Sequence, residues 1–170
     1  DITTDAGIET LKGLSKGREY DLVVCIAGLL ESNELGSLSL DSLRRQYEIN
    51  AIAPLRIAEL LRGNMPAGSK LALISSRMGS MDDNSSGGRY GYRMSKAALN
   101  AAGKSLSVDL QPAGIAVGIF HPGWVRTAMT GFGGHLDPDE CAALLVQRMD
   151  ELNLDNAGRF VHAEGEILPW

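Results

Sequence analysis

Apolar and polar positions along the chain follow two alternating patterns. Four short apolar runs are bounded by Gly, Pro, Ser or Asp, and each predicts a strand. The runs are continuous, which is typical of strands that are covered on both faces of a parallel sheet. The four predicted strands are Leu22–Ile26, Lys70–Ile74, Ile115–Phe120 and Gly158–Val161.

Between the strands, apolar residues recur at the three- and four-residue spacing of amphipathic helices. The longest predicted helix covers about 90–110 and ends before Pro112. Pro54 interrupts another helical stretch, so we expect a kink near Asn50. The other predicted helices begin at capping residues, which are Thr4 or Asp5, Ser39 or Asp41, and Asp137.

Strand and helix thus alternate throughout, and this order predicts an α/β fold with a parallel sheet, right-handed crossovers and helices on both faces. With 170 residues, the chain is expected to form a single domain over 1–170. Functional sites of such sheets lie at the carboxyl ends of the strands. We expect these ends, Ala27-Gly28, Ser75-Ser76 and Pro122-Gly123, to share one rim.

Composition narrows the functional classes. The formal net charge is −5 and no Lys/Arg run occurs, which argues against nucleic-acid binding. The longest apolar run, Leu22–Leu30, is too short to span a membrane, and no signal peptide is visible. Cys25 and Cys141 make no disulfide framework, so we expect a cytoplasmic setting. The three histidines lack metal-ligand spacing, so no metal site is predicted.

Tyr92 and Lys96 are the first candidates for chemistry. They lie four residues apart on the longest predicted helix, so their side chains share one face. An ammonium near a phenol favours the phenolate and makes the tyrosine a better proton donor. The same spacing also occurs on ordinary helix surfaces, and the pair alone does not decide between the two.

Two polar residues extend this candidate site. Ser76 ends the second predicted strand, and its hydroxyl is expected on the rim where the Tyr92 helix begins. Ser75 is a rival for the same role, and either hydroxyl could simply bind the next loop. Asn50 lies on an apolar helical stripe, where a buried amide is costly unless it is hydrogen-bonded. It could hold a water or the backbone freed by the kink, or only satisfy helix carbonyls.

These residues, in this order, resemble the short-chain dehydrogenase/reductase family, and the resemblance covers essentially the whole chain. The insertion before the tyrosine, 84–88, the run 104–110 and the Gly-Arg-Phe ending look like the sniffer or C-factor-like carbonyl reductase branch. The motifs that carry the family resemblance are Asn50, the segment 74–80, Tyr92-Arg93-Met94-Ser95-Lys96 and the segment 121–127.

The resemblance implies a Rossmann-like, doubly wound sheet and hydride transfer between a nicotinamide cofactor, NADP or NAD, and a small-molecule carbonyl or alcohol. Tyr92 would be the general acid, Ser76 would hydrogen-bond the carbonyl oxygen, and Asn50 would anchor a proton-relaying water. Lys96 would lower the pKa of Tyr92 and hold the nicotinamide ribose. The remaining cofactor-binding positions implied by the family are Asp1 at the adenine, Ala27 and Gly28 at the adenine-side ribose, and Pro122, Gly123 and Thr127 at the nicotinamide.

The chain departs from the family pattern in two places. Cys25-Ile26-Ala27-Gly28 stands where the family usually has Asn-Asn-Ala-Gly. No Gly-x-x-x-Gly-x-Gly turn occurs, and Asp1 stands where the family's third strand would be ending, so the first strands are expected to be absent and Leu22–Ile26 to form an open edge. The sequence could be a fragment, a naturally short chain that completes its sheet by dimerisation, or one half completed by a partner.

Two function hypotheses follow from this pattern. The first is a carbonyl reductase for which this chain supplies the catalytic half, and the second is a non-catalytic remnant that binds or signals. The sequence selects neither the substrate nor NADP over NAD, because the discriminating charge of the family lies upstream. We also expect a homo-oligomer, because the small residues Ala97, Ala101 and Ser105 make one face of the Tyr92 helix suited to close packing on a second copy or on the protein's own core.

Overall fold

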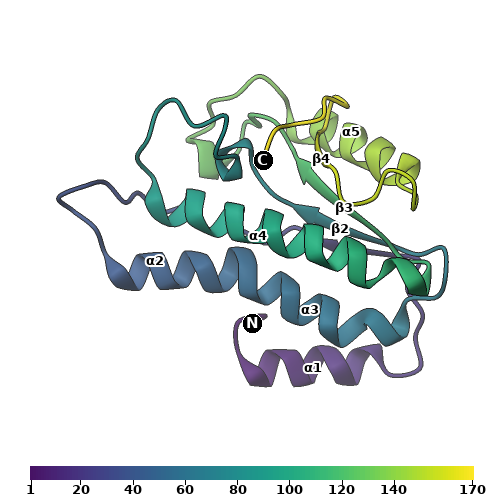
Figure 1. The fold of residues 1–170 in the computed structure, drawn as a ribbon. Helices are drawn as coiled ribbons and strands as arrows, with labels where there is room; N and C mark the ends of the chain where they lie inside the picture. The colour runs from purple at the N-terminus through teal and green to yellow at the C-terminus, as the bar shows by residue number, and fades with distance from the viewer.

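The computed structural model describes residues 1–170 and has a four-stranded parallel sheet at its centre (Figure 1). The strands follow one another across the sheet in chain order, β1-β2-β3-β4. Leu22 pairs with Lys70, Lys70 with Ala116, and Ile119 with Phe160. The strand bounds are β1 (Leu22–Cys25), β2 (Lys70–Ile74), β3 (Ala116–His121) and β4 (Phe160–His162).

Helices connect the strands as the alternating pattern predicts. Thr4 caps the first helix by accepting a hydrogen bond from the Gly7 amide (3.1 Å), and Asp137 opens the last helix with a capping box. The helices are α1 (Asp5–Ser15), α2 (Leu40–Tyr47), α3 (Ala53–Leu61), α4 (Tyr90–Asp109) and α5 (Pro138–Glu151), with a π-helical turn η1 (Glu48–Ile52) and the 3-10 turns η2 (Arg62–Asn64), η3 (Arg77–Gly79), η4 (Gln111–Ala113) and η5 (Ala128–Thr130).

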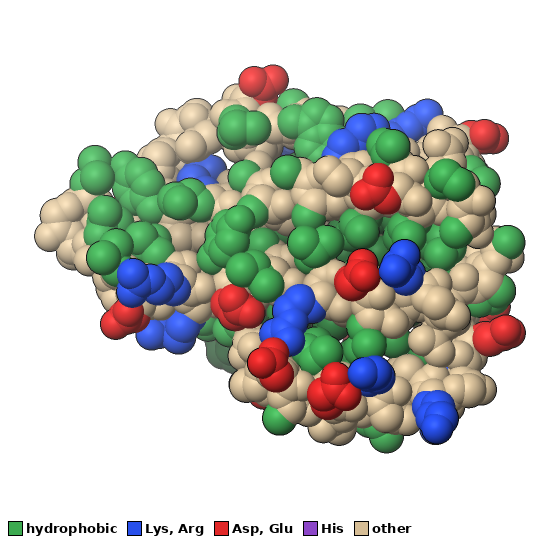
Figure 2. All heavy atoms as spheres, turned by 60° about the horizontal axis from the view of Figure 1, so that its bottom comes forward, with side chains coloured by type: hydrophobic (Ala, Val, Ile, Leu, Met, Phe, Trp, Pro, Cys, Tyr) green, Lys and Arg blue, Asp and Glu red, His purple; other side chains and the backbone are tan.

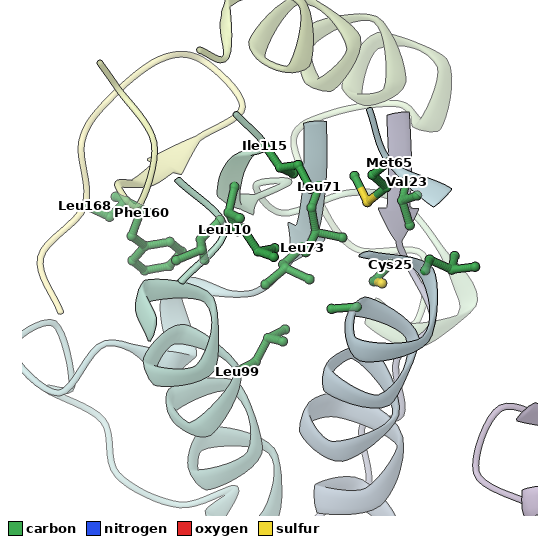
Figure 3. Packing of buried hydrophobic residues seen from close by; sticks show 14 residues of the cluster. Val23, Cys25, Met65, Leu71, Leu73, Leu99, Leu110, Ile115, Phe160 and Leu168 are labelled. Carbon is green, nitrogen blue, oxygen red and sulfur yellow. The ribbon is translucent and has the colours of Figure 1, made fainter. Parts of the chain in front are cut away.

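The sheet has a separate hydrophobic cluster on each face, and the prediction of helices on both faces is therefore confirmed. On one face, Leu73 and Ile119 point toward α3 and α4 and pack with Leu99 (Figure 3). On the other face, Ile74 and Phe120 belong to a cluster with residues of α5. That second cluster comprises Ala72, Ile74, Ala116, Phe120, Cys141, Leu145, Met149, Leu152 and Ala163.

The irregularity expected near Asn50 is present, and it takes the form of a π-helical turn that contains Asn50. Pro54 occupies the first turn of α3, where its missing N–H is tolerated, and the backbone irregularity lies before it as the π-helical turn η1. The wider turn absorbs one extra residue without breaking the continuous helical path from α2 through η1 to α3. Asn50 lies within this turn and is completely buried.

β1 forms one edge of the sheet, as predicted. Val23 and Cys25 are buried against the α3 and α4 face, whereas Leu22 and Val24 are 43% and 39% exposed. The helical side of the molecule formed by α1, α2 and α3 shows hydrophobic side chains interspersed with charged ones (Figure 2). None of the helices combines the length and apolar character needed to cross a membrane, and no cluster of three or more metal-ligating side chains occurs.

Candidate active site

The carboxyl end of β2 carries two serines with different surroundings. The Ser75 hydroxyl donates to Asn100 Oδ1 on α4 at 2.5 Å, which assigns Ser75 to the contact between sheet and helix. Ser76 begins the turn η3, and its hydroxyl oxygen accepts from the Met78 amide at 3.2 Å. The Ser76 hydroxyl faces the rim, whereas the Ser75 hydroxyl is used in a contact with α4. Ser76 is therefore the better candidate for a chemical role.

α4 brings Tyr92 and Lys96 to the same rim. Both are buried, with 7% and 3% of their surface exposed, and Lys96 Nζ lies 5.8 Å from the centre of the Tyr92 ring. Lys96 Nζ donates to the Ile74 carbonyl oxygen of β2 at 2.9 Å. The approach of η3 to α4 depends on Gly79, because a Cβ there would lie 2.7 Å from the carbonyl carbon of Lys96. One missing side chain thus lets Ser76 approach the helix.

Burial shifts the pKa values of both α4 groups. It lowers the pKa of Lys96 from 10.5 to about 8, because the charged ammonium is desolvated. It raises the pKa of the Tyr92 phenol, and the Ser76 hydroxyl beside it acts in the opposite direction with a smaller effect. The sequence suggested that Lys96 lowers the pKa of Tyr92. Lys96 instead points its ammonium at the Ile74 carbonyl, and desolvation of the phenol is the larger effect in this arrangement.

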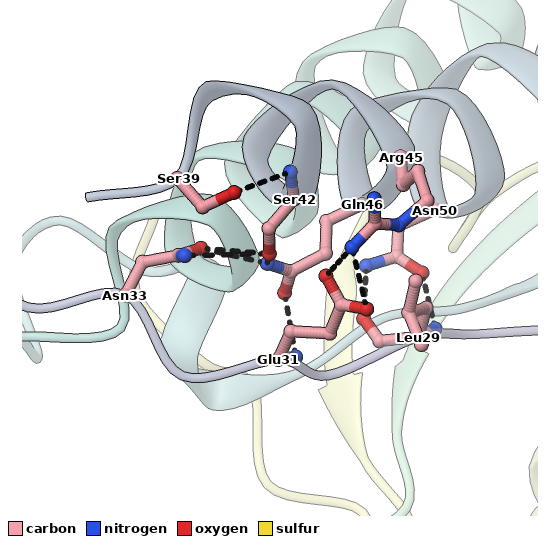
Figure 4. A network of polar contacts seen from close by, with 8 residues as sticks. All are labelled: Leu29, Glu31, Asn33, Ser39, Ser42, Arg45, Gln46 and Asn50. Carbon is pink, nitrogen blue, oxygen red and sulfur yellow. Dashed lines mark hydrogen bonds and ion pairs between the residues drawn. The ribbon is translucent and has the colours of Figure 1, made fainter. Parts of the chain in front are cut away.

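Asn50 joins three parts of the site through its side-chain amide (Figure 4). Its Oδ1 accepts from the Leu29 amide at 2.7 Å, and its Nδ2 donates to the Leu29 carbonyl oxygen at 2.8 Å. Nδ2 also donates to the Ser95 hydroxyl on α4 at 2.9 Å. Of the interpretations open from the sequence, binding of backbone is the one seen here, although the backbone belongs to the segment after β1 and not to the helix itself.

A second amide fixes the same segment further along. Gln46 Oε1 accepts from the Glu31 amide at 3.1 Å, and its Nε2 donates to Asn33 Oδ1 at 2.8 Å (Figure 4). Arg45 forms a two-pronged ion pair with Glu31 at 2.9 and 3.0 Å. Residues 29–33 are therefore held on α2 and η1 by polar contacts, without strand hydrogen bonds of their own.

Gly28 forms an open cradle beside these polar groups. A Cβ at Gly28 would lie 3.6 Å from Asn50 Oδ1, 3.7 Å from Lys96 Nζ and 4.0 Å from Met129 Cε. The absent side chain leaves space for a ligand to approach the backbone, the amide oxygen and the ammonium together. Ala27 and Gly28 are both exposed. This cradle fits a ligand that carries hydroxyl groups, such as a ribose.

The end of β3 supplies another wall of the rim. Gly123 has a φ of +88° and lies next to His162, whose Nε2 would be 3.3 Å from a Cβ at this position. The Pro122 carbonyl oxygen accepts from the Cys141 thiol at 3.3 Å. Thr127 opens the turn η5 with a capping box.

Asp1 is engaged locally. Its Oδ1 accepts from the amide and the hydroxyl of Thr3, at 2.9 and 2.8 Å. None of its hydrogen bonds reaches Asn50, Ser76, Tyr92 or Lys96. The proposed adenine contact of Asp1 therefore stays a prediction.

Three residues near the rim were not singled out from the sequence. Ser95 is the α4 partner of Asn50, and Met129 reaches the Gly28 cradle. His162 pairs in the sheet with His121, and their ring centres lie 5.0 Å apart. Burial, with smaller effects of His162 and Arg77, lowers the pKa of His121 to about 3, which keeps it neutral above that pH. His162 ends the last strand, and the strand-end rule could have found it had β4 been predicted one residue longer.

The chain matches known proteins over most or all of its length. The family model described as Enoyl-(Acyl carrier protein) reductase matches residues 1–148. The 1-hydroxy-2-glutathionyl-2-methyl-3-butene dehydrogenase of Rhodococcus sp. (strain AD45) is 40% identical in an alignment that covers 100% of this chain and 78% of that protein.

Two solved structures match over the whole chain. The carbonyl reductase Sniffer of D. melanogaster has a TM-score of 0.88 at 32% identity, and 76% of that chain is covered. A carbonyl reductase from Pseudomonas aeruginosa PAO1 in complex with NADP has a TM-score of 0.86 at 31% identity, with 75% covered. The chain therefore belongs to the short-chain dehydrogenase/reductase family of oxidoreductases, in the branch that resembles the Sniffer carbonyl reductases.

Proposed function

We propose that this protein catalyses the reduction of a small-molecule carbonyl, or the reverse oxidation of the alcohol, with Tyr92 as general acid or base. One observation carries the proposal: α4 and the end of β2 bring a phenol, a serine hydroxyl and an ammonium together on one rim. Each of these groups is buried, and Lys96 retains N–H donors that no protein acceptor uses, since it has three and bonds one acceptor, the Ile74 carbonyl oxygen.

The cofactor we propose is NADP or NAD, because the Pseudomonas aeruginosa relative is described in complex with NADP and the Gly28 cradle suits a ribose. When bound, the nicotinamide supplies the hydride for the reaction. Lys96 Nζ would hold the nicotinamide ribose, Ala27 and Gly28 would border the adenine-side ribose, and Pro122, Gly123 and Thr127 would form the wall on the nicotinamide side.

The protein's own residues supply the proton and stabilise the negative charge that develops on the carbonyl oxygen. Because burial raises its pKa, the Tyr92 phenol is protonated at neutral pH and is ready to donate to the oxygen of the carbonyl. The Ser76 hydroxyl donates to the same oxygen and stabilises the negative charge that develops there. Lys96, with a pKa of about 8, is mostly an ammonium at pH 7 and favours the phenolate left behind. Asn50 holds the Leu29 backbone and Ser95, and so positions the segment that borders the cradle.

Replacing Tyr92 by Phe tests the proposal directly. We expect the rate of carbonyl-dependent NADPH or NADH oxidation to fall roughly 100-fold to 10,000-fold, because a positioned proton donor contributes that much. Tyr90→Phe is the matched control, since Tyr90 is only half-buried, lies two residues away and has no assigned role. The two variants are compared by absorbance at the nicotinamide band, with circular dichroism to verify folding. Equal rates in the parent and Tyr92→Phe would overturn the mechanism.

Cofactor binding distinguishes the enzyme from the alternative of a non-catalytic binding or signalling protein. Titration of the chain with NADPH and with NADH, followed by nicotinamide fluorescence, is expected to give saturable binding. Lys96→Met should weaken it, since the ammonium at the cradle is lost. Absence of binding together with absence of activity would favour the non-catalytic alternative.

Two further expectations complete the proposal. Assembly into a homo-oligomer is supported by the small-residue face of α4, on which Ala101 and Ser105 are exposed and Ala97 is half-buried. Light scattering of the purified chain checks this. A cytoplasmic location stays a prediction from the cysteine usage.

A further inference from the structure

The face of the sheet opposite Tyr92 carries a second concave site. A hollow of about 170 Å³ lies between α5, the outer part of β3 and β4, and the turn that follows β4. We call it the α5 hollow and define it by its apolar floor, Phe120, Leu152 and Val161, and its rim, Arg148, Arg159 and Ile167. Phe120 belongs to the cluster under α5, whereas the neighbouring Ile119 faces α4. The hollow is therefore separated from the candidate active site by the sheet.

Arg148 is the group in this hollow whose hydrogen bonding is incomplete. Its side chain is only 13% exposed, and it forms one ion pair, from Nη2 to Glu151 Oε1 at 2.8 Å. Its Nε is fully buried and has no acceptor. Arg148 Nη1 lies beside Gly165, where an added Cβ would be 2.5 Å from it. Nη1 forms no hydrogen bond either. A guanidinium has five N–H donors, so most of the hydrogen-bonding capacity of this one is unused.

Such an arrangement is energetically costly unless an acceptor is present. A buried donor without a partner is destabilising, and the cost is greater when the group is charged. Glu151 offsets one positive charge, but Arg159 adds a second whose only hydrogen bond is a long one, 3.4 Å to the Asp155 carbonyl oxygen. The hollow thus keeps an excess of positive charge on a protein whose formal net charge is −5. An anion is the ligand that this excess selects.

The floor of the hollow restricts what else the anion can carry. Phe120, Leu152 and Val161 line it with apolar side chains, of which Phe120 and Leu152 are largely buried, and the Phe120 ring lies over Gly118. The volume is close to that of an engineered apolar cavity of about 150 Å³ that binds benzene, so the hollow suits a ligand of about six non-hydrogen atoms. A carboxylate meets a guanidinium with two parallel hydrogen bonds, and its short hydrocarbon chain matches the floor.

We propose that the α5 hollow binds a small monocarboxylate, with the carboxylate on Arg148 and Arg159 and a short apolar chain on Phe120, Leu152 and Val161. The site is independent of the hydride-transfer chemistry proposed for the other face of the sheet. Its occupant supplies an acceptor to Arg148 Nη1, which forms no hydrogen bond within the protein, and its hydrocarbon chain covers the apolar floor.

Nuclear magnetic resonance of the full 170-residue chain tests this with butyrate as the probe. We expect saturable shifts of the Gly118 and Gly165 amide resonances and of the Arg148 Nε–H resonance, while the Gly28 amide on the other side of the sheet stays unchanged. Butyramide, which has nearly the same shape but no charge, should bind at least roughly tenfold more weakly, because it lacks the charge-assisted hydrogen bonds. Inorganic phosphate should also bind more weakly, because it cannot use the apolar floor.

Two arginine variants and one control complete the experiment. Arg148→Gln and Arg159→Gln should each weaken butyrate binding, by roughly tenfold and several-fold. Arg159 is exposed, so its variant tests the site even if Arg148→Gln disturbs folding. Arg62→Gln is the matched control, because Arg62 follows α3 and pairs with Glu59 far from the hollow. Butyrate binding that is absent, equal to that of butyramide, or unchanged in both arginine variants would overturn the proposal.

Discussion

The two faces of the sheet bury polar groups in different ways. On the α4 face, Asn50 lies at 0% exposure with three hydrogen bonds, and Gln46 is bonded at both ends of its amide. On the α5 face, the Arg148 guanidinium has one carboxylate partner and a buried Nε without any. A satisfied network holds its members in one geometry, whereas unused donors mark a place for a ligand. The Asn50 and Gln46 amides on the α4 face are thus satisfied by the protein, although Asn100 Nδ2 on that face is also buried without a partner, whereas the Arg148 guanidinium on the α5 face keeps several donors open.

The largest effect on stability is expected from Asn50→Ala. The substitution removes three hydrogen bonds and leaves the amide and carbonyl of Leu29 without these partners, so the free energy of unfolding should fall by about 4 kcal/mol. Urea denaturation measures the change. Asn64→Ala is a suitable control, since its two bonds, to the Ser15 and Arg18 carbonyl oxygens, lie at a more exposed turn. Equal losses in both variants would contradict the special role of the Asn50 network.

The two hydrophobic clusters provide the next test. Leu73 is fully buried between sheet and α4, and Leu73→Ala should cost about 4 kcal/mol through lost burial and a residual cavity. Leu145 on α5 is 7% exposed and belongs to the smaller cluster, so Leu145→Ala should cost about 2 kcal/mol, near the lower end of the range for such substitutions. The paired measurement is again urea denaturation. A larger loss from the α5 leucine would reverse the ranking of the two faces.

Lys96 is expected to make the free energy of unfolding depend on pH. In the folded state its pKa is about 8, below the ordinary 10.5, so between these values the unfolded chain binds more protons and stability rises with pH. Two buried acids act in the opposite direction: Cys25, whose pKa is raised from 9.0 to about 11, does so above about pH 9, and Tyr92 does so above about pH 10, where a free phenol would ionise. Lys96→Met removes the desolvated ammonium and also the bond to Ile74, so the net rise in the free energy of unfolding at pH 7 should be about 2 kcal/mol. The same substitution should abolish carbonyl reduction.

The measurement is denaturation of the parent and the Lys96→Met variant at pH values from about 7 to about 9, where the two states of Lys96 differ in protonation and a free thiol is still mostly protonated. The parent should gain stability across this window and the variant should not. Lys104→Met is the matched control, because Lys104 is an exposed lysine on the same helix. A variant that keeps the parent's pH dependence would rule out Lys96 as its source.

The smallest effect concerns the start of α5. Asp137 caps this helix in a reciprocal box with Glu140, so Asp137→Ala should lower the free energy of unfolding by about 1 kcal/mol. Asp137→Asn retains a capping oxygen but loses the ion pair with Arg126, which is exposed and contributes little. The Asp137→Asn variant is thus expected to stay within about 0.5 kcal/mol of the parent in urea denaturation. A loss in Asp137→Asn as large as in Asp137→Ala would assign the effect to the ion pair.

The periodic parts of the fold could be predicted from the sequence. Apolar runs locate all four strands, with ends that differ by one or two residues, and capping residues such as Thr4 and Asp137 locate the helix starts. The π-helical turn at 48–52 could not, because Pro54 has the same local signature whether it kinks a helix or opens a new first turn. That distinction depends on what the turn packs against.

The candidate site was predictable as a set of residues but not as a set of contacts. Strand ends place Ser76 on the rim, and the helical spacing places Tyr92 beside Lys96. The partner of Asn50 is the backbone of Leu29, 21 positions earlier, and no local pattern encodes such a pair. The direction of the Tyr92 pKa shift likewise depends on how deeply the ring is buried, and spacing along a helix does not report depth.

The chain-order arrangement of the sheet has a consequence for how the protein folds. Leu22 pairs with Lys70, Lys70 with Ala116 and Ile119 with Phe160, so the partners are 48, 46 and 41 positions apart. Each ladder must close a long loop before its hydrogen bonds compensate the lost entropy, and folds with such distant pairings form slowly. The bonds of Lys96 to Ile74 and of Asn50 to Leu29 join residues only 22 and 21 positions apart, and each lies within one of these long connections. Closing these shorter loops costs less entropy, so each bond can form before the ladder that encloses it and help to bring the strands together.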